Sequence, residues 1–297
     1  MPINGRLTAS PGPAIALSGG TLPRIRALEP SLRPADKKFA RLVLSDPASL
    51  IHVTVSEAAA LAGTGTATVV RCCQELGFRG FHDLKLALAT ELVPTGQAVP
   101  DDIGPADSPS EIVRKVLTAD ADAVRDTLWI LDTAAFERIV AALHGARRIL
   151  FVAVGSSAPL AQDAAYRMVT IGAGAEAPAD AHVQHVAASL LTPADVCFAV
   201  SHTGSTRETV AAATAARDAG ARVVAVTSFA RSPLTEVTHE HLVVASRETR
   251  FRIEAMASRI AHLSVLDALV VSLALSGRAA AEASLERSGR ALSEHRF

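Results

Sequence analysis

The chain has 297 residues and a formal net charge of −1, and 49% of its residues are hydrophobic while only 4% are aromatic. The near-neutral charge gives no global attraction to nucleic acid, and the length allows about two domains of roughly 150 residues each. The three cysteines, of which Cys72 and Cys73 are adjacent, form neither a disulfide framework nor a zinc-binding spacing. We therefore expect a reducing, cytoplasmic compartment and no metal, cofactor, signal peptide or membrane span.

The pattern of apolar residues divides the chain into four parts. Residues 1–21 mix Pro, Gly and Ser without periodicity, which predicts a disordered tail. Residues 22–93 predict an all-α domain, and residues 94–109, rich in Pro and Asp, predict a linker. In residues 110–297 strands alternate with helices, so we expect an α/β domain with a five-stranded parallel sheet between helices.

Two short helices in the first of these domains are joined by a turn that contains glycine. Thr54 and Glu57 have the spacing of a capping box for the first helix, which Gly63 ends. The second helix begins near Thr66 and stops at Gly77. Such a pair is the signature of a helix-turn-helix, whose second helix reads DNA.

The second helix of this pair has one apolar and one polar face. Helical spacing places Val69, Cys73 and Leu76 together, which predicts that this face is buried and that Cys72 and Cys73 are core residues rather than redox sensors. Polar side chains on the other face can contact DNA bases, and the Arg and Lys side chains that follow the helix can contact DNA phosphates. The candidates are Thr66, Thr68, Arg71 and Gln74 for bases and Arg79 and Lys85 for phosphates.

Two helices are expected before the first strand of the α/β domain. Ser110, with Glu111 beside it, is the expected cap of the first helix, and Asp132 is the expected cap of the second. Both helices offer apolar surface that a second subunit could cover. The chain then ends in a long apolar helix within residues 251–277 and a polar helix after it.

Residues 196–208 form the clearest ligand-binding pattern. Val196 to Val200 predict a buried strand, followed by a turn around Gly204 and then by a helix. Ser201, Thr203, Ser205 and Thr206 supply four hydroxyls, and this turn contains no Lys or Arg before residue 207. Because free N–H groups and the dipole at a helix N-terminus attract anions, the turn predicts a phosphate held by neutral donors.

A second turn follows the first expected strand. Gly155, Ser156 and Ser157 open a helix there, although Ser157 is equally well explained as a plain N-cap. Ala153 stands where a dinucleotide fold would have its first glycine, so the dinucleotide interpretation is weak. The carboxyl ends of parallel strands meet at one edge of an open sheet, so we expect both turns at one ligand-binding edge.

These motifs resemble those of a known family. The turns Ala153-Val154-Gly155-Ser156-Ser157 and Ser201-His202-Thr203-Gly204-Ser205-Thr206-Arg207-Glu208 resemble those of the SIS (sugar isomerase) domain, which binds phosphosugars, although Ala153 replaces its first glycine. Residues 67–71 and 76–81 resemble the reader-helix signature of the RpiR family of bacterial regulators, which joins this helix-turn-helix to one SIS domain. The resemblance runs from about Leu22 to Leu275.

The resemblance implies roles for individual residues. It implies that the phosphate contacts are Ser157, Ser201, Thr203 and Thr206, with Ser156, His202 and Gly204 close by. Residues 180–184 resemble a stretch that faces the pocket, and Glu254 with Ser258 and Arg259 resembles the segment that closes it. Structural interpretations stay open for Asp180 as a helix cap, for His182 and His185 as surface residues, and for Glu254 as a solvated helical residue.

The leading interpretation is a transcriptional regulator that is not an enzyme. It would bind operator DNA as a homo-oligomer, a dimer or a tetramer, and its SIS domain would sense a phosphosugar effector without contact to a membrane. One alternative is a sugar-phosphate isomerase with Glu254 as base and His182 or His202 as acid. The N-terminal reader helix has no use in an isomerase. A second alternative is a scaffold that keeps the SIS fold without binding a ligand.

Overall fold

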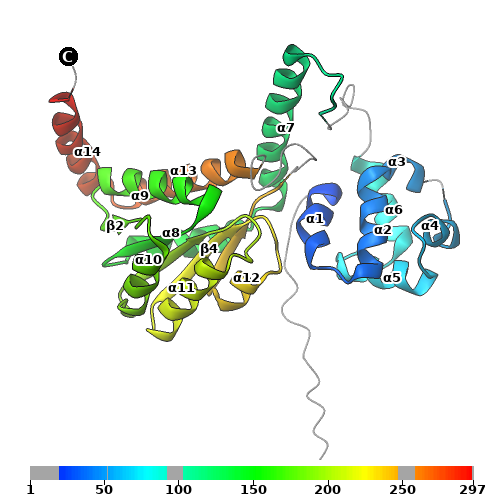
Figure 1. Ribbon diagram of the computed structural model, residues 1–297, viewed down its shortest axis with the longest axis horizontal. Helices are drawn as coiled ribbons and strands as arrows, with labels where there is room; N and C mark the ends of the chain where they lie inside the picture. Colours follow the sequence, from blue (N-terminus) through cyan, green and yellow to red (C-terminus); the bar gives the residue numbers. More distant parts are fainter. Residues whose placement is uncertain (1–19, 52, 92–102, 247–257, 296–297) are drawn as a thin grey trace, which may run out of the picture.

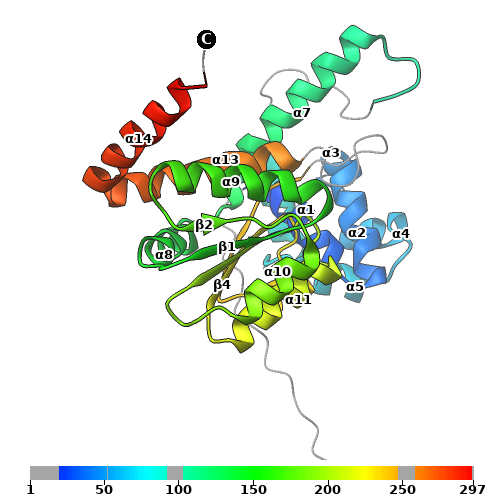
Figure 2. The ribbon, with the colours of Figure 1, turned by 60° about the vertical axis from the view of Figure 1, so that its left-hand side comes forward.

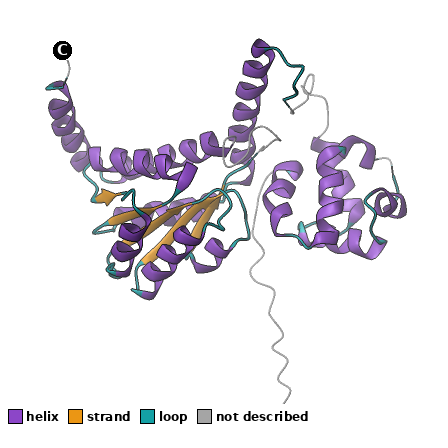
Figure 3. Ribbon diagram, viewed as in Figure 1, coloured by secondary structure: helices purple, strands orange, loops and turns teal. Residues whose placement is uncertain are grey.

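The computed structural model describes residues 20–51, 53–91, 103–246 and 258–295. The N-terminal part is all-helical, as expected (Figure 1, Figure 3). Its core contains large side chains with almost no exposed surface, among them Phe39, Leu50, Leu76 and Leu84. The helices are α1 (Thr21–Leu28), α2 (Pro34–Ser45), α3 (Pro47–Leu50), α4 (Val55–Leu61), α5 (Thr66–Glu75) and α6 (Phe81–Glu91), with a 3-10 turn η1 (Glu29–Ser31) after α1.

The helix-turn-helix has the predicted form. The Thr54 side chain accepts a hydrogen bond from the backbone of Glu57, whose carboxylate accepts one in return, so the capping box of α4 is confirmed. Val69, Cys73 and Leu76 of the second helix and its end are buried, as predicted. α1 was not expected from the sequence, although Leu22, Ile25, Ala27 and Leu28 give it an apolar side and Pro23 lies in its first turn, where proline is tolerated.

Two helices lead into the sheet. α7 (Pro109–Ile130) is capped by Ser108 and not by the expected Ser110. The Ser108 hydroxyl and the Glu111 carboxylate form a capping box, and Pro109 occupies the first helical position, where a missing N–H costs nothing. α8 (Thr133–His144) is capped by Asp132 as predicted, with a 2.9 Å hydrogen bond from the Ala135 N–H.

The α/β part contains a five-stranded parallel sheet with strand order β2-β1-β3-β4-β5, which confirms the expected fold class. The strands are β1 (Ile149–Val152), β2 (Ala175–Glu176), β3 (Val196–Val200), β4 (Arg222–Thr227) and β5 (Glu240–Val243). The remaining helices are α9 (Ala158–Thr170), α10 (Ala181–Ser189), α11 (Arg207–Asp218), α12 (Pro233–Val237), α13 (Ser258–Ser276) and α14 (Arg278–Ser293), with a 3-10 turn η2 (Gly155–Ser157) before α9.

Successive strand residues point to opposite faces of the sheet, and in these strands both sets are apolar. Helices accordingly cover both faces (Figure 2). Phe151 and Phe198 stack with ring centroids 4.9 Å apart and pack with α8, α9 and α13. Leu150 and Cys197 point to the other face and pack with α10, α11 and α12. Both faces of the sheet are therefore shielded from water, as expected for strands made of apolar residues.

Two helices project from the α/β part. The N-terminal half of α7 and the C-terminal end of α14 extend away from the sheet in both views, while Ala281 and Ser284 in the first half of α14 are buried (Figure 1, Figure 2). Among the described helices, α13 has the length and apolar composition of a membrane span, but its buried residues belong to the core over the sheet.

Candidate functional site

The carboxyl ends of β1 and β3 form the topological centre of the sheet. β1 and β3 are neighbours, and the chain order reverses between them, since β2 lies beyond β1 and β4 beyond β3. Val152 pairs with Ala199, so the turns that follow these two strands emerge at the same edge. Open α/β sheets bind their ligands in the crevice at such a point. The two hydroxyl-rich turns therefore lie where they were expected.

In the turn after β3 the hydroxyls bond mainly within the turn. The buried Ser201 Oγ accepts a 3.1 Å hydrogen bond from the Gly204 N–H and lies 3.4 Å from Thr206 Oγ1. Thr203 Oγ1 accepts a 3.2 Å bond from the Ser205 N–H. Thr206 is the N-cap residue of α11, but its side chain does not cap the helix. The first N–H groups of α11 consequently keep their attraction for an anion.

Glycine is required at position 204. Its φ is +61°, in the left-handed region, and an added Cβ would lie 2.1 Å from Ser232 Oγ. The neighbouring loop between β4 and α12 therefore presses directly on the backbone of the turn.

The backbone at the start of the turn after β1 is hydrogen-bonded to a buried side-chain amide. Gln184 on α10 accepts a 3.0 Å hydrogen bond from the Ala153 N–H and donates a 2.8 Å bond to the Ala153 carbonyl. Ser157 is buried and occupies the N-cap position of α9, but its side chain makes no capping hydrogen bond. Ser156 is exposed, and Gly155 has open space around it.

His202 links the turn after β3 to the start of α13. A 2.8 Å hydrogen bond joins its Nδ1 to Ser258 Oγ, and both residues are buried. On the next turn of α13, His262 donates from Nδ1 to the Ser258 carbonyl over 3.0 Å, while its Nε2 has no partner among the described residues. Burial lowers the pKa of His262 to about 4, so this imidazole is neutral. Arg259 is exposed, and Glu254 lies outside the described residues.

The structure decides between the two interpretations of the polar residues at the start of α10 and on it. Asp180 accepts a 3.0 Å hydrogen bond from the Val183 N–H, so the cap interpretation is confirmed. His182 and His185 are exposed, as the surface interpretation predicted.

Two buried hydroxyls near these turns were missed from the sequence. Ser228 Oγ and Thr209 Oγ1 have no hydrogen-bond partner among the described residues. Ser228 directly follows β4, the strand beside β3, so its position at the ligand edge could have been inferred. Thr209 lies in the first turn of α11, beyond the motif, and no sequence signal marked it.

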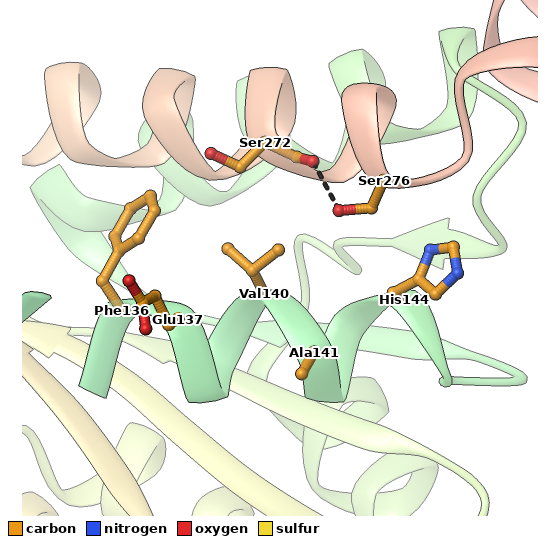
Figure 4. A pocket seen from close by; sticks show the side chains of 7 residues that line it. All are labelled: Phe136, Glu137, Val140, Ala141, His144, Ser272 and Ser276. Atoms are coloured by element: carbon orange, nitrogen blue, oxygen red, sulfur yellow. Dashed lines mark hydrogen bonds between the residues drawn. The ribbon is translucent and has the colours of Figure 1, made fainter. Parts of the chain in front are cut away.

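A groove of about 450 Å³ lies elsewhere, between α8 and α13 (Figure 4). Phe136 and Val140 face it from α8, and Ser276 on α13 bonds to the Ser272 carbonyl beside it. None of the expected phosphate contacts lines this groove, and the Glu137 carboxylate at its rim would repel a phosphate.

On the helix-turn-helix, α5 presents a polar outer face. Thr66 and Gln74 are exposed, Thr68 is partly buried, and Val70 is exposed between them. Gly63 and Gly65 keep the turn to α4 short, and Gly65 caps α5 without a side chain. This arrangement fits a helix that enters a groove of DNA.

The three expected cationic contacts all have partners within the chain. Arg71 donates a 2.8 Å hydrogen bond to Asp36. The Arg79 guanidinium bonds to Asp83 over 3.1 Å but is 90% exposed. Lys85 donates to the Val53 carbonyl over 2.8 Å. Of these three side chains, Arg79 exchanges its partner for a phosphate most easily, because an exposed ion pair contributes little stability.

Among the residues that the structure describes, no group of three or more His, Cys, Asp or Glu side chains is arranged to hold a metal ion.

The chain joins a helix-turn-helix to a parallel α/β domain whose two hydroxyl-rich turns meet at one edge, and comparisons give the family. Residues 19–95 match the helix-turn-helix domain of the rpiR family, and residues 142–272 match the SIS domain. The chain belongs to the RpiR family of HTH-type transcriptional regulators and carries a C-terminal SIS domain.

Several relatives share this organisation. The chain is 35% identical over 267 residues to an HTH-type transcriptional regulator of Haemophilus influenzae. The aligned residues cover 89% of this chain and 92% of the relative. It is 33% identical to the HTH-type transcriptional regulator YbbH of Bacillus subtilis, over 87% of this chain and 92% of YbbH. The solved structure of the Vibrio vulnificus NanR protein complexed with ManNAc-6P superposes with a TM-score of 0.59 at 29% identity, over 93% of this chain and 98% of NanR.

Proposed function

We propose that this regulator senses a phosphorylated sugar or sugar acid and changes its operator binding in response. The observation that carries the proposal is the pair of hydroxyl-rich turns at the β1/β3 edge, next to the N-terminus of α11. Neutral hydroxyls and helix N–H groups favour a phosphate. The structural neighbour NanR was solved with ManNAc-6P, which supports an effector of this class.

The proposed effector contacts follow the geometry of the edge. Ser201, Thr203 and Thr206 would bind the phosphate from the β3 side and Ser157 from the β1 side, with Ser156, His202 and Gly204 beside them. Glu254 is proposed for a sugar hydroxyl on the strength of the family resemblance.

For the DNA side we propose that α5 enters the major groove. Its candidate base contacts are Thr66, Thr68, Arg71 and Gln74, and the candidate phosphate contacts are Arg79 and Lys85. We propose residues 22–93 as the DNA-binding unit, 94–109 as a linker after a tail of residues 1–21, and 110–297 as the effector unit. The compartment is the cytoplasm, where operator DNA is accessible.

We propose a homo-oligomer, because one reader helix carries too little positive charge for tight binding. The projecting helix α7 supports self-association, since Val113 and Leu117 on it are 58% and 63% exposed. Sedimentation equilibrium of the full chain tests this and separates a dimer from a tetramer. A monomer at micromolar concentration would contradict it.

The experiment that tests the function combines two measurements on the full chain. Calorimetric titration with ManNAc-6P, glucose 6-phosphate, fructose 6-phosphate and inorganic phosphate is expected to identify a ligand. A DNA duplex selected by the protein from a random library then reports whether this ligand changes DNA affinity. Absence of binding to the whole panel would reject the proposal and favour the scaffold alternative.

The same compounds test the isomerase alternative. The regulator proposal expects no interconversion of the aldose and ketose phosphates. Turnover that disappears in the variant Glu254→Gln would instead establish an enzyme.

A further inference from the structure

α1 is shared between the two parts of the chain. On one side the Thr21 N–H bonds to the Glu91 carboxylate of α6, and the Arg24 guanidinium lies 4.7 Å from the centre of the Phe78 ring. On the other side α1 contacts the α/β part through an ion pair and a backbone hydrogen bond. A movement of α1 relative to the sheet therefore also moves the N-terminal helices, α5 among them.

The contact of α1 with the α/β part is apolar and polar, since Ile130, Val243 and Ala245 join the core of the N-terminal helices. Arg26 pairs with Asp126 of α7 over 3.4 Å. The Ala230 N–H donates a 3.2 Å hydrogen bond to the Ala27 carbonyl, and both alanines are buried in the core of the N-terminal helices. Ala230 lies in the loop between β4 and α12, residues 228–232, which we name the β4–α12 loop.

The same loop contacts the turn after β3 on its other side. The His202 carbonyl accepts hydrogen bonds from the Ser228 N–H at 2.9 Å and from Thr227 Oγ1 at 3.1 Å. The Leu234 N–H donates to the Gly204 carbonyl over 2.9 Å, directly after the loop. Ser232 lies against Gly204 so closely that no Cβ fits between them. The five-residue β4–α12 loop thus contacts both the turn after β3 and α1.

The hydrogen bonds of this junction leave one group unsatisfied. Ser228 Oγ is buried, with 1% of the residue exposed, and has no partner among the described residues. A buried hydroxyl without a partner costs free energy, so a movement of the loop that gives this hydroxyl a partner recovers part of that cost. The loop can therefore respond to small changes in the turn after β3.

We propose that the β4–α12 loop transmits occupancy of the phosphate site to the DNA-binding helices by changing the docking of α1. The inference rests on the proposed phosphate role of the turn after β3. A phosphate there accepts hydrogen bonds, so it competes with Ser201 Oγ for the Gly204 N–H and with the 3.4 Å contact between the Ser201 and Thr206 hydroxyls. When Gly204 and His202 move, their carbonyls carry the β4–α12 loop with them and alter the contact of Ala230 with Ala27.

Hydrogen exchange of the full chain tests the first step. Glucose 6-phosphate and inorganic phosphate are the probes, and calorimetry under the same conditions measures their binding. We expect a bound probe to change the exchange rates of the amides of residues 21–28 at least threefold. Binding without any change in these amides overturns the inference and leaves the proposed function intact. A lack of binding by both probes overturns the inference together with its phosphate premise.

A reversible crosslink tests the second step. The hydrogen bond between Ala230 and Ala27 places their Cα atoms within about 7 Å, so the double variant Ala27→Cys/Ala230→Cys can form a disulfide. The three native cysteines are buried, but Cys72 and Cys73 share a core with Ala27 and Ala230, so peptide mapping has to show that the engineered pair is the one oxidised. In the oxidised variant the probe should still bind, while its effect on affinity for the selected DNA duplex should fall at least tenfold and return on reduction. An undiminished effect in the oxidised protein overturns the inference.

If the crosslink does not form, Arg26→Ala weakens the same docking contact by removing the ion pair with Asp126. Probe affinity should stay within twofold of wild type, and the effect of the probe on DNA affinity should change at least threefold. An unaltered effect overturns the inference.

Discussion

The Arg71 guanidinium donates a 2.8 Å hydrogen bond to Asp36, whose carboxylate has no exposed surface. This pair ties the proposed reader helix α5 to α2. The interaction with Asp36 raises the pKa of Arg71 above its ordinary value. Arg71 is therefore a structural residue of the helix-turn-helix, whatever else it contacts.

The variant Arg71→Ala should lower the thermal midpoint of unfolding by more than about 5 °C, because it leaves a buried carboxylate without its partner. Thermal unfolding monitored by circular dichroism measures this. The control is Gln74→Ala on the exposed face of α5, which should leave the midpoint within about 1 °C while it weakens binding to the selected DNA duplex. Equal midpoints for the Arg71 variant and wild type would show that the pair does not stabilise the fold.

Thr206→Val replaces a hydroxyl by a methyl group of similar size at the N-terminus of α11. If Thr206 is a phosphate donor, effector affinity should fall about tenfold, since a hydrogen bond to a charged group contributes about 1.5 kcal/mol or more. DNA affinity without effector should not change. Thr214→Val two turns further along the same helix is the matched control, because its hydroxyl bonds only to the Val210 carbonyl. Identical titrations for Thr206→Val and Thr214→Val would exclude the assignment.

Gly204→Ala should be destabilising and should abolish effector binding, because both the left-handed backbone and the contact with Ser232 reject a Cβ. Gly63→Ala has nearly the same φ, +60°, with no atom within 4 Å of the added Cβ. Its cost is the backbone term alone, about 1–2 kcal/mol, so chemical denaturation should show the larger loss for the variant at Gly204. A smaller loss there would mean that Ser232 moves aside freely.

His262 makes the stability of the protein sensitive to acid. Burial lowers its pKa from 6.5 to about 4, so the unfolded chain takes up a proton that the folded chain refuses. Stability should therefore fall by up to about 3 kcal/mol as the pH drops from about 6.5 to about 4. Arg147 lowers the pKa of Asp195 to about 2, so this pair loses its contribution only at lower pH, below about 3.8.

The variant His262→Leu should flatten the fall in unfolding free energy over this pH window, measured by urea denaturation. A residual slope is expected because burial also lowers the pKa of His241. His185→Leu, at an exposed position, should keep the full slope. A slope that is the same in both variants would rule out His262 as its cause.

The thiols of Cys72, Cys73 and Cys197 should not react in the folded protein. Burial raises the pKa of each thiol to about 12, which lowers the thiolate fraction about 1000-fold relative to an ordinary cysteine. A colorimetric thiol assay at pH 8 should titrate all three only after denaturation. Rapid modification of one thiol in the native chain would revive the redox-sensor interpretation.

Apart from α1, the sequence by itself determined the main elements and their order. The alternation of apolar strands with helices predicted the parallel sheet, and parallel strands bring their carboxyl ends to one edge, so Ser157 and Ser201 could be placed together in advance. The capping box of Thr54 and Glu57 was equally predictable, because it depends on residues three apart. Local spacing is sufficient for features of this kind.

Only the tertiary structure decided which polar side chains are already engaged. Asp36 and Arg71 are 35 residues apart, and Gln184 and Ala153 are 31 residues apart, so no local pattern reveals their bonds. The docking of Ala230 against Ala27 joins segments that lie in different parts of the chain. Such pairs form because a buried polar group must find a partner wherever packing brings one close, and packing depends on the whole fold.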